Sequence, residues 1–159
     1  MQGYGDDFAP IYNMRWGSFA DRVAPQIRTF YETTEIGRQN RNLLDLCCGT
    51  GQLALHFLEH GYQVLGLDLS PAMLAHARDN ASAYVADGRA RFIEGDAADY
   101  EVPGTYGLAV ATFDALNHLP DRIALQGCFD ATRAALVDNG IFIFDLNTLA
   151  GLHRWGGVT

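Results

Sequence analysis

The chain has 159 residues, of which 48% are hydrophobic and 19% charged, and its formal net charge at pH 7 is −8. This size and composition are typical of one soluble globular domain, and the negative charge, without a cluster of Lys or Arg, excludes nucleic acid as an expected partner. No apolar run reaches the ~18 residues of a membrane span and the first residues do not resemble a signal peptide, so we expect no membrane association and a cytoplasmic location.

The N-terminal region combines an aromatic row with a helix signal. Aromatic residues recur at every fourth position, namely Tyr4, Phe8, Tyr12 and Trp16. Ser18 and Asp21 resemble a capping box that starts a helix, which Pro25 is expected to kink or restart. We assign residues 1–35 to a helical segment and 36–159 to the main part of a single domain. The segment either packs on that domain or forms a lid over its ligand.

From Asn42 onward, strand and helix signals alternate. The predicted strands are 42–46, 62–67, 90–94, 106–112 and 141–146, and the predicted helices are 52–60, 71–80 and 121–138. Gly61 and Gly140 are expected to close two of the helices. The run Ile141–Phe144 is continuously apolar, as in a strand buried on both faces. This alternation predicts an α/β fold, with a doubly wound, mostly parallel sheet covered by helices on both faces.

A glycine-rich loop follows the first predicted strand. Gly49 and Gly51 flank one threonine, so the backbone can turn tightly and a ligand can approach the main chain. Gly49 and Gly51 with Ala54 also satisfy a relaxed dinucleotide fingerprint, which keeps an NAD(P) or flavin cofactor open. Asp45 argues against it, because a carboxylate next to the loop repels a pyrophosphate and attracts a ligand that carries an ammonium and a sulfonium.

Three cysteines are present, and two of them are adjacent. Cys47 and Cys48 point to opposite sides of an extended backbone, so their spacing does not match a zinc site. Cys128 falls on an apolar helical face. We predict reduced thiols that serve as small packing residues, and no metal.

Each predicted strand ends at an acidic residue. These residues are Asp45, Asp68, Asp96, Asp114 and Asp145. The carboxyl ends of parallel strands meet at one edge of a sheet, where ligands bind. Asp68 lies 19 residues beyond Gly49, at a position where a carboxylate accepts both hydroxyls of a ribose. Since Ser70 fills the helix cap, ribose binding is the best use of Asp68. For Asp114 and Asp145 we favour a role as hydrogen-bond anchors or caps.

Residues 40–148 resemble the class I S-adenosylmethionine-dependent methyltransferases. The matching segments, in the family's order and spacing, are Asp45–Gly51, Gly66–Leu74, Glu94–Ala97, Phe113–Leu119 and Asn139–Asp145. The resemblance implies a Rossmann-like fold and S-adenosyl-L-methionine as the cofactor. It also implies transfer of a methyl group to a small-molecule nitrogen or oxygen acceptor.

The resemblance also implies roles for the loop and its acids. Cys47, Gly49 and Gly51 would lie against the methionine part of the cofactor. Asp45 would hold the ammonium, directly or through water, and Asp68 the ribose hydroxyls.

Further roles follow for residues along the strand ends. Leu69 and Met73 would sandwich the adenine, with Asp96 and Ala97 at its amino edge. Phe113 would lie beside the methionine and sulfonium. Tyr12 and Trp16 are the candidates for the lid.

His118 is the candidate catalytic base. A hydroxyl acceptor needs a base, whereas an amine needs only a neutral lone pair. Leu116 and Leu119 beside His118 favour instead a residue packed within the loop after the fourth strand.

Family members normally add two strands after the fifth, and this chain stops shortly after that point. We therefore expect a truncated sheet with the fifth strand at an exposed edge. We favour the interpretation that the chain is part of a longer protein; the alternative is that a second copy covers the edge as a homodimer. Two alternatives to a methyltransferase remain open: a non-catalytic module that binds S-adenosylmethionine or S-adenosylhomocysteine, and an NAD(P)-dependent oxidoreductase.

Overall fold

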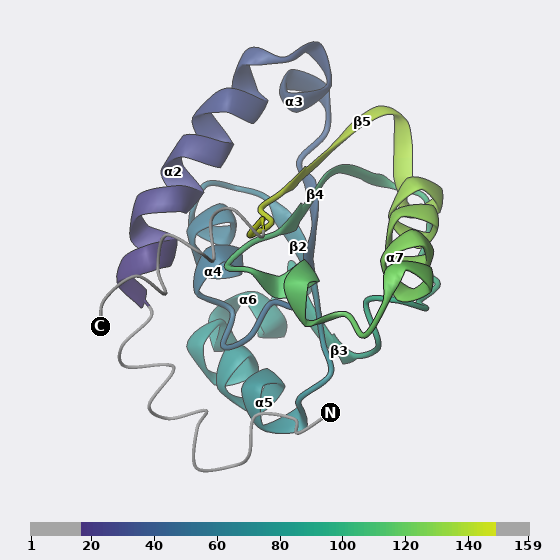
Figure 1. Cartoon of the computed structure of the whole chain (residues 1–159). Helices are drawn as coiled ribbons and strands as arrows, with labels where there is room; N and C mark the ends of the chain where they lie inside the picture. The colour runs from purple at the N-terminus through teal and green to yellow at the C-terminus, as the bar shows by residue number, and fades with distance from the viewer. Residues whose placement is uncertain (1–16, 149–159) are drawn as a thin grey trace, which may run out of the picture.

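Five parallel strands form one sheet in the order β3-β2-β1-β4-β5 (Figure 1). The computed structural model describes residues 17–148. The strands are β1 (Asn42–Leu46), β2 (Gln63–Asp68), β3 (Ala90–Glu94), β4 (Tyr106–Ala111) and β5 (Leu136–Phe144). The helices are α2 (Gly17–Thr33), α3 (Glu35–Gln39), α4 (Gln52–Glu59), α5 (Pro71–Asn80), α6 (Ser82–Ala86), the short 3-10 helix η1 (Ala115–His118) and α7 (Arg122–Ala135). The strand order reverses between β1 and β4, which confirms the doubly wound α/β prediction.

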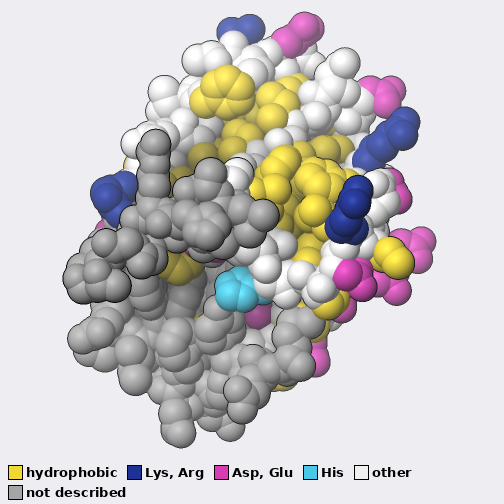
Figure 2. All heavy atoms as spheres, in the orientation of Figure 1, with side chains coloured by type: hydrophobic (Ala, Val, Ile, Leu, Met, Phe, Trp, Pro, Cys, Tyr) yellow, Lys and Arg dark blue, Asp and Glu magenta, His cyan; other side chains and the backbone are white. Residues whose placement is uncertain are grey.

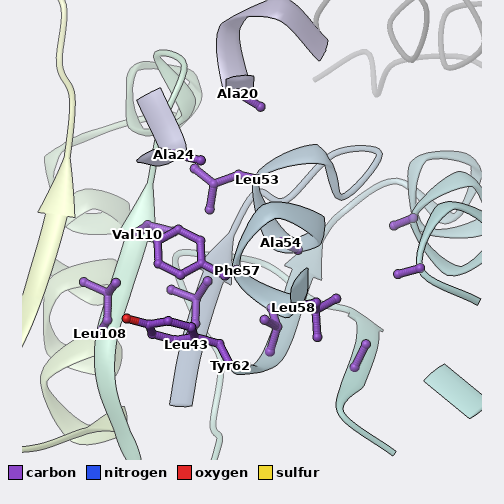
Figure 3. Packing of buried hydrophobic residues seen from close by; sticks show 14 of the residues in the cluster. Ala20, Ala24, Leu43, Leu53, Ala54, Phe57, Leu58, Tyr62, Leu108 and Val110 are labelled. Carbon is purple, nitrogen blue, oxygen red and sulfur yellow. The ribbon is translucent and has the colours of Figure 1, made fainter. Parts of the chain in front are cut away.

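Two apolar cores lie on opposite faces of the sheet. On one face, α2, α4 and α5 share one core with side chains of the sheet such as Leu43 and Val110, and Phe57 and Tyr62 fill the centre (Figure 3). On the other face, α7 contributes Cys128 and Ala135 beneath the alternate side chains of the same strands. Figure 1 shows α7 alone on its side of the sheet. The sheet is therefore covered more fully on the face of α2, α4 and α5.

The predicted bounds of β1, β3 and α5 agree with the structure, but the prediction for α7 and β5 was wrong. The helix was expected to run to 138 and to end at Gly140, and the strand to begin at 141. Instead α7 ends at Ala135, the backbone of Leu136 is already extended (φ −81°, ψ 143°), and Leu136 pairs with Tyr106 of β4. Gly140 lies inside β5. Pairing with β4 begins at Leu136 and resumes at Ile141, with a register shift in between, where Asn139 has a φ of 63°. This tertiary pairing overrides the local helical pattern.

Pro25 does not restart α2, which runs as one helix through it from Gly17 to Thr33. The carbonyl that loses its partner belongs to Asp21, an exposed residue, so water can satisfy it. The buried residues Ala24, Ile27 and Tyr31 hold the helix on the α4 face of the sheet. Packing therefore offsets the missing hydrogen bond.

β5 lies at the edge of the sheet, as expected, but its apolar run is not buried on both faces. Ile141, Phe142 and Ile143 are half-buried, and Phe144 is 39% exposed. The rings of Phe142 and Phe144 lie 5.7 and 5.2 Å from that of Phe129 on α7. Figure 2 shows apolar side chains gathered on this side of the molecule. Within residues 17–148, no helix is long and apolar enough to cross a membrane.

Candidate functional site

The five strand-end acids lie along one edge of the sheet. β1 contains Asp45 and β2 ends at Asp68, while the other three acids follow β3, β4 and β5. All strands are parallel, so their carboxyl ends share that edge. The predicted convergence of these residues is confirmed by the topology.

The glycine loop is a tight turn that leads into α4. Cys47, Gly49 and Gly51 have positive φ angles of 55, 54 and 77°, and the Gly51 N–H donates to the Cys48 carbonyl at 3.0 Å. A Cβ atom at Gly51 would lie 3.0 Å from the Cβ of Ala77 on α5. Only glycine therefore fits this turn without strain or displacement of α5. Gly51 precedes α4 without a side-chain cap, so the first N–H groups of the helix lie beside the loop.

Asp45 is buried beside this loop and is only partly satisfied. It is 2% exposed, and its carboxylate accepts the backbone N–H of Ala54 in the first turn of α4. Its Oδ2 atom is buried with no hydrogen-bond partner among the described residues. Burial, and then the nearby Asp68, raise the pKa of Asp45 to about 8. A cationic donor at Oδ2 would satisfy this carboxylate and favour its charged form.

Thr50 provides a second buried polar atom without a hydrogen-bond partner among the described residues. The sequence alone did not assign this residue a role. It is 1% exposed, and its Oγ1 atom has no partner among the described residues. Asn80 fixes the backbone of Thr50 by donating to its carbonyl at 2.9 Å. The sequence contained one signal for a role of Thr50. It lies between Gly49 and Gly51, so its hydroxyl is next to the backbone that a ligand could approach.

Asp68 joins the glycine loop to the start of α5. Its Oδ2 accepts the Gly49 N–H at 2.8 Å, and its Oδ1 accepts the Ser70 N–H at 2.9 Å. Burial raises the pKa of Asp68, while the backbone N–H groups around it lower it. Ser70 caps α5 as predicted, through the Met73 N–H. However, ribose binding is not the only use of Asp68, because its carboxylate also accepts backbone N–H groups of the protein, those of Gly49, Ser70 and Leu69.

The residues predicted to hold an adenine differ in exposure. Leu69 is 55% exposed, whereas Met73 is 2% and Ala97 2% exposed. Asp96 is exposed and accepts the Ala98 N–H at 2.8 Å. Leu69 and Asp96 are therefore accessible from outside, whereas Met73 and Ala97 are buried. Tyr12 and Trp16 lie outside the described residues.

The loop after β4 has an unusual backbone. Phe113 and Asp114 have φ angles of 67 and 58°, each at a cost of about 1–3 kcal/mol for a residue other than glycine. Asp145 anchors this loop as expected, because its Oδ2 accepts the Asp114 N–H at 3.0 Å. The side chain of Asp114 makes no cap for η1. His118 is exposed on η1, so the expectation that it packs within the loop was wrong.

The cysteines are free thiols. Cys47 packs with the α7 core and Cys48 with the α4 core, so they point to opposite faces as predicted. Burial, and then the nearby carboxylates, raise the pKa of Cys47 to about 12 and that of Cys48 well above its usual value. Both thiols therefore stay protonated. Residues 17–148 contain no group of three His, Cys, Asp or Glu placed to hold a metal ion.

These groups together fit a ligand that offers a cation and a diol. Asp45 and Asp68 offer carboxylate oxygens that suit such donors. An anionic pyrophosphate would face the same two carboxylates and be repelled.

Comparison with known proteins places this geometry in a family. The profile of the family described as "Methyltransferase domain" matches residues 43–140. A ubiquinone biosynthesis O-methyltransferase of Xanthomonas campestris is 31% identical over 130 residues, which cover 76% of this chain and 52% of the relative.

Solved structures agree with the sequence comparisons. The glycopeptide N-methyltransferase MtfA superposes with a TM-score of 0.68 at 26% identity, over 79% of this chain and 52% of its own. The SAM-bound amino pentose methyltransferase CalS10 of Micromonospora echinaspora has a TM-score of 0.68 at 26% identity. The match covers 93% of this chain and 59% of CalS10. The chain spans about half the length of the curated relatives it matches.

Proposed function

The chain belongs to the methyltransferase-domain family, and on that premise we propose that it binds S-adenosyl-L-methionine and forms the cofactor-binding portion of a small-molecule methyltransferase. The observation that carries the proposal is Asp45. Its buried, unpartnered Oδ2 lies at the glycine loop in the field of Asp68. An ammonium group, held directly or through water, supplies the donor that this atom lacks.

The remaining candidate residues bind the other parts of the cofactor. Asp68 accepts the ribose hydroxyls, and Cys47, Gly49 and Gly51 border the methionine part. Leu69 and Asp96 contact the adenine, with Met73 and Ala97 behind them, and Phe113 lies beside the sulfonium. Tyr12 and Trp16 complete the site as a lid.

Bound S-adenosylmethionine supplies an activated methyl group, so the chain's own residues mainly align the acceptor and exclude water. The acceptor is a nitrogen or oxygen atom of a small molecule, in keeping with relatives described as O-methyltransferase and N-methyltransferase. His118 is exposed on η1, where it can accept the proton of a hydroxyl acceptor. An amine acceptor needs no such base.

Calorimetric titration with S-adenosylmethionine, S-adenosylhomocysteine and NAD tests the cofactor. We expect the first two to bind and NAD to give no response. Binding of NAD alone would support the oxidoreductase alternative and contradict the proposal. Because the chain spans about half of its relatives, a non-catalytic binding module is the second candidate. Methyl transfer from S-adenosylmethionine to any acceptor in a metabolite screen would exclude it.

Binding should also release a proton. The pKa of Asp45 is raised to about 8 by burial, so below that pH the free site holds a protonated carboxyl that ionises when the ammonium arrives. Affinity should therefore rise with pH up to about 8, and titration at pH 6.5 in buffers of different ionisation enthalpy should show release of about one proton. Affinity that stays constant from pH 6 to pH 8 would contradict this role of Asp45.

We also propose a cytoplasmic protein in which a second copy of the chain covers the β5 edge. Among the described strands, β5 pairs only with β4. Phe144, the last residue of β5, is exposed. Light scattering should give the mass of a dimer, and Phe144→Glu should give a monomer. The exposed Ile123→Glu on α7 serves as the control. A monomeric wild-type chain at every concentration would exclude the dimer.

A further inference from the structure

The segment after β5 holds the loop after β4 in its strained conformation. We propose that Asp145, assisted by Asn117, is a positioning residue of the site: it keeps Phe113 and η1 where the cofactor and the acceptor meet. This inference rests on the proposed function, which assigns Phe113 to the sulfonium region and His118 to the acceptor.

The loop requires something to hold it. Phe113 and Asp114 are consecutive residues with left-handed φ angles, and neither is glycine. A bulky residue such as phenylalanine rarely adopts this conformation. Such backbone persists only where surrounding contacts enforce it, and these contacts are commonly found at ligand sites.

Asp145 makes two hydrogen bonds that bracket the strained turn. Its backbone N–H donates to the carbonyl of Ala111 at 3.3 Å, just before the turn. Its Oδ2 atom accepts the N–H of Asp114 at 3.0 Å, just after Thr112 and Phe113. One residue therefore ties both sides of the turn to the end of β5.

Asn117 makes a second attachment one turn later. Its Nδ2 donates to the carbonyl of Asn147 at 3.0 Å, and its Oδ1 accepts the N–H of Asn147 at 2.9 Å. This reciprocal pair extends the β4–β5 pairing onto η1, although both residues are exposed. Since η1 also carries His118, the two attachments together set the positions of Phe113 and His118.

The other carboxylate oxygen of Asp145 shows that the residue is not optimised for stability alone. Its Oδ1 is buried without a partner among the described residues, which is unfavourable. An asparagine would keep an oxygen for the Asp114 N–H and put an amide NH2 in place of the unpartnered oxygen. Asp145→Asn is thus the matched control for Asp145→Ala, which removes the acceptor.

The test measures the affinity of the folded chain for S-adenosylmethionine, together with hydrogen exchange. We expect Asp145→Ala to weaken binding about tenfold, the loss of one hydrogen bond to a charged group, and Asp145→Asn to stay within about threefold of the wild type. Exchange should increase over residues 112–118 in Asp145→Ala and remain unchanged over 47–51. Asn117→Ala, which changes an exposed side chain, should give a smaller change of the same kind.

A double variant separates positioning from general stabilisation. Glycine adopts the φ angle of Asp114 without strain, so adding Asp114→Gly to Asp145→Ala should recover much of the lost affinity. Wild-type affinity in Asp145→Ala, or equal losses in Asp145→Ala and Asp145→Asn, would overturn the inference. If the wild-type chain itself does not bind S-adenosylmethionine, the proposed function is wrong. The exchange data still decide the inference in that case, since unchanged exchange over 112–118 in Asp145→Ala overturns it.

Discussion

Asp68→Ala should weaken the binding of S-adenosylmethionine by about 100-fold or more. The carboxylate is proposed to accept the ribose hydroxyls, and each hydrogen bond to a charged group contributes roughly 1.5–3 kcal/mol, or about a factor of ten or more. The same substitution removes the acceptor of the Gly49 and Ser70 N–H groups. The glycine loop should therefore lose its attachment to α5 as well.

Calorimetry on the folded variant, with its thermal midpoint measured in parallel, checks this result. Asp68→Asn keeps an acceptor oxygen on one side of the group but loses the charge, so its affinity should fall between those of the wild type and Asp68→Ala. Asp79→Ala removes a similar charge from an exposed position on α5 and should bind as the wild type does. Undiminished affinity in Asp68→Ala would remove the central assignment of the site.

Asp45→Asn should have opposite effects on stability and on binding. Burial raises the pKa of Asp45 to about 8, whereas the same group ionises near its usual pKa of about 4 in the unfolded chain. The unfolded chain therefore releases this proton first, and the free energy of unfolding should decrease as pH rises from about 4 to about 8. Asparagine does not ionise, so the variant should lose this dependence, and its stability relative to the wild type should increase from pH 5 to pH 8.

The affinity for S-adenosylmethionine should fall in the same variant by about 10- to 100-fold, because the ammonium loses its charged partner. Asparagine keeps an oxygen for the Ala54 N–H, so α4 should remain in place. Urea unfolding at pH 5 and pH 8 provides the internal control, since the two proteins should differ less at pH 5. A variant that binds normally, or whose stability depends on pH as the wild type's does, would refute the role of Asp45.

Helix and strand positions were predictable where local pattern and tertiary structure agree. The proline after Ser70, the apolar run of β1 and the mixed buried and exposed positions of β3 lie in elements whose bounds were predicted correctly. They were not predictable at Val137–Gly140, where local sequence favours a helix and a glycine end. Pairing of Leu136 with Tyr106 ends the helix just before this stretch, and the register then shifts so that Ile141 pairs with Leu108. No local pattern contains these partners.

The order of residues along the chain by itself determined the kind of site: a glycine loop, acids at the strand ends and a fold that brings them to one edge. Those features depend on spacing and residue type, which are local properties. Only the tertiary structure decided what each acid does. Asp45 is buried and half satisfied, Asp68 ties the loop to α5, and Asp145 holds the turn after β4. Burial and hydrogen bonding depend on neighbours distant in sequence, so these roles became visible only when the strands were paired.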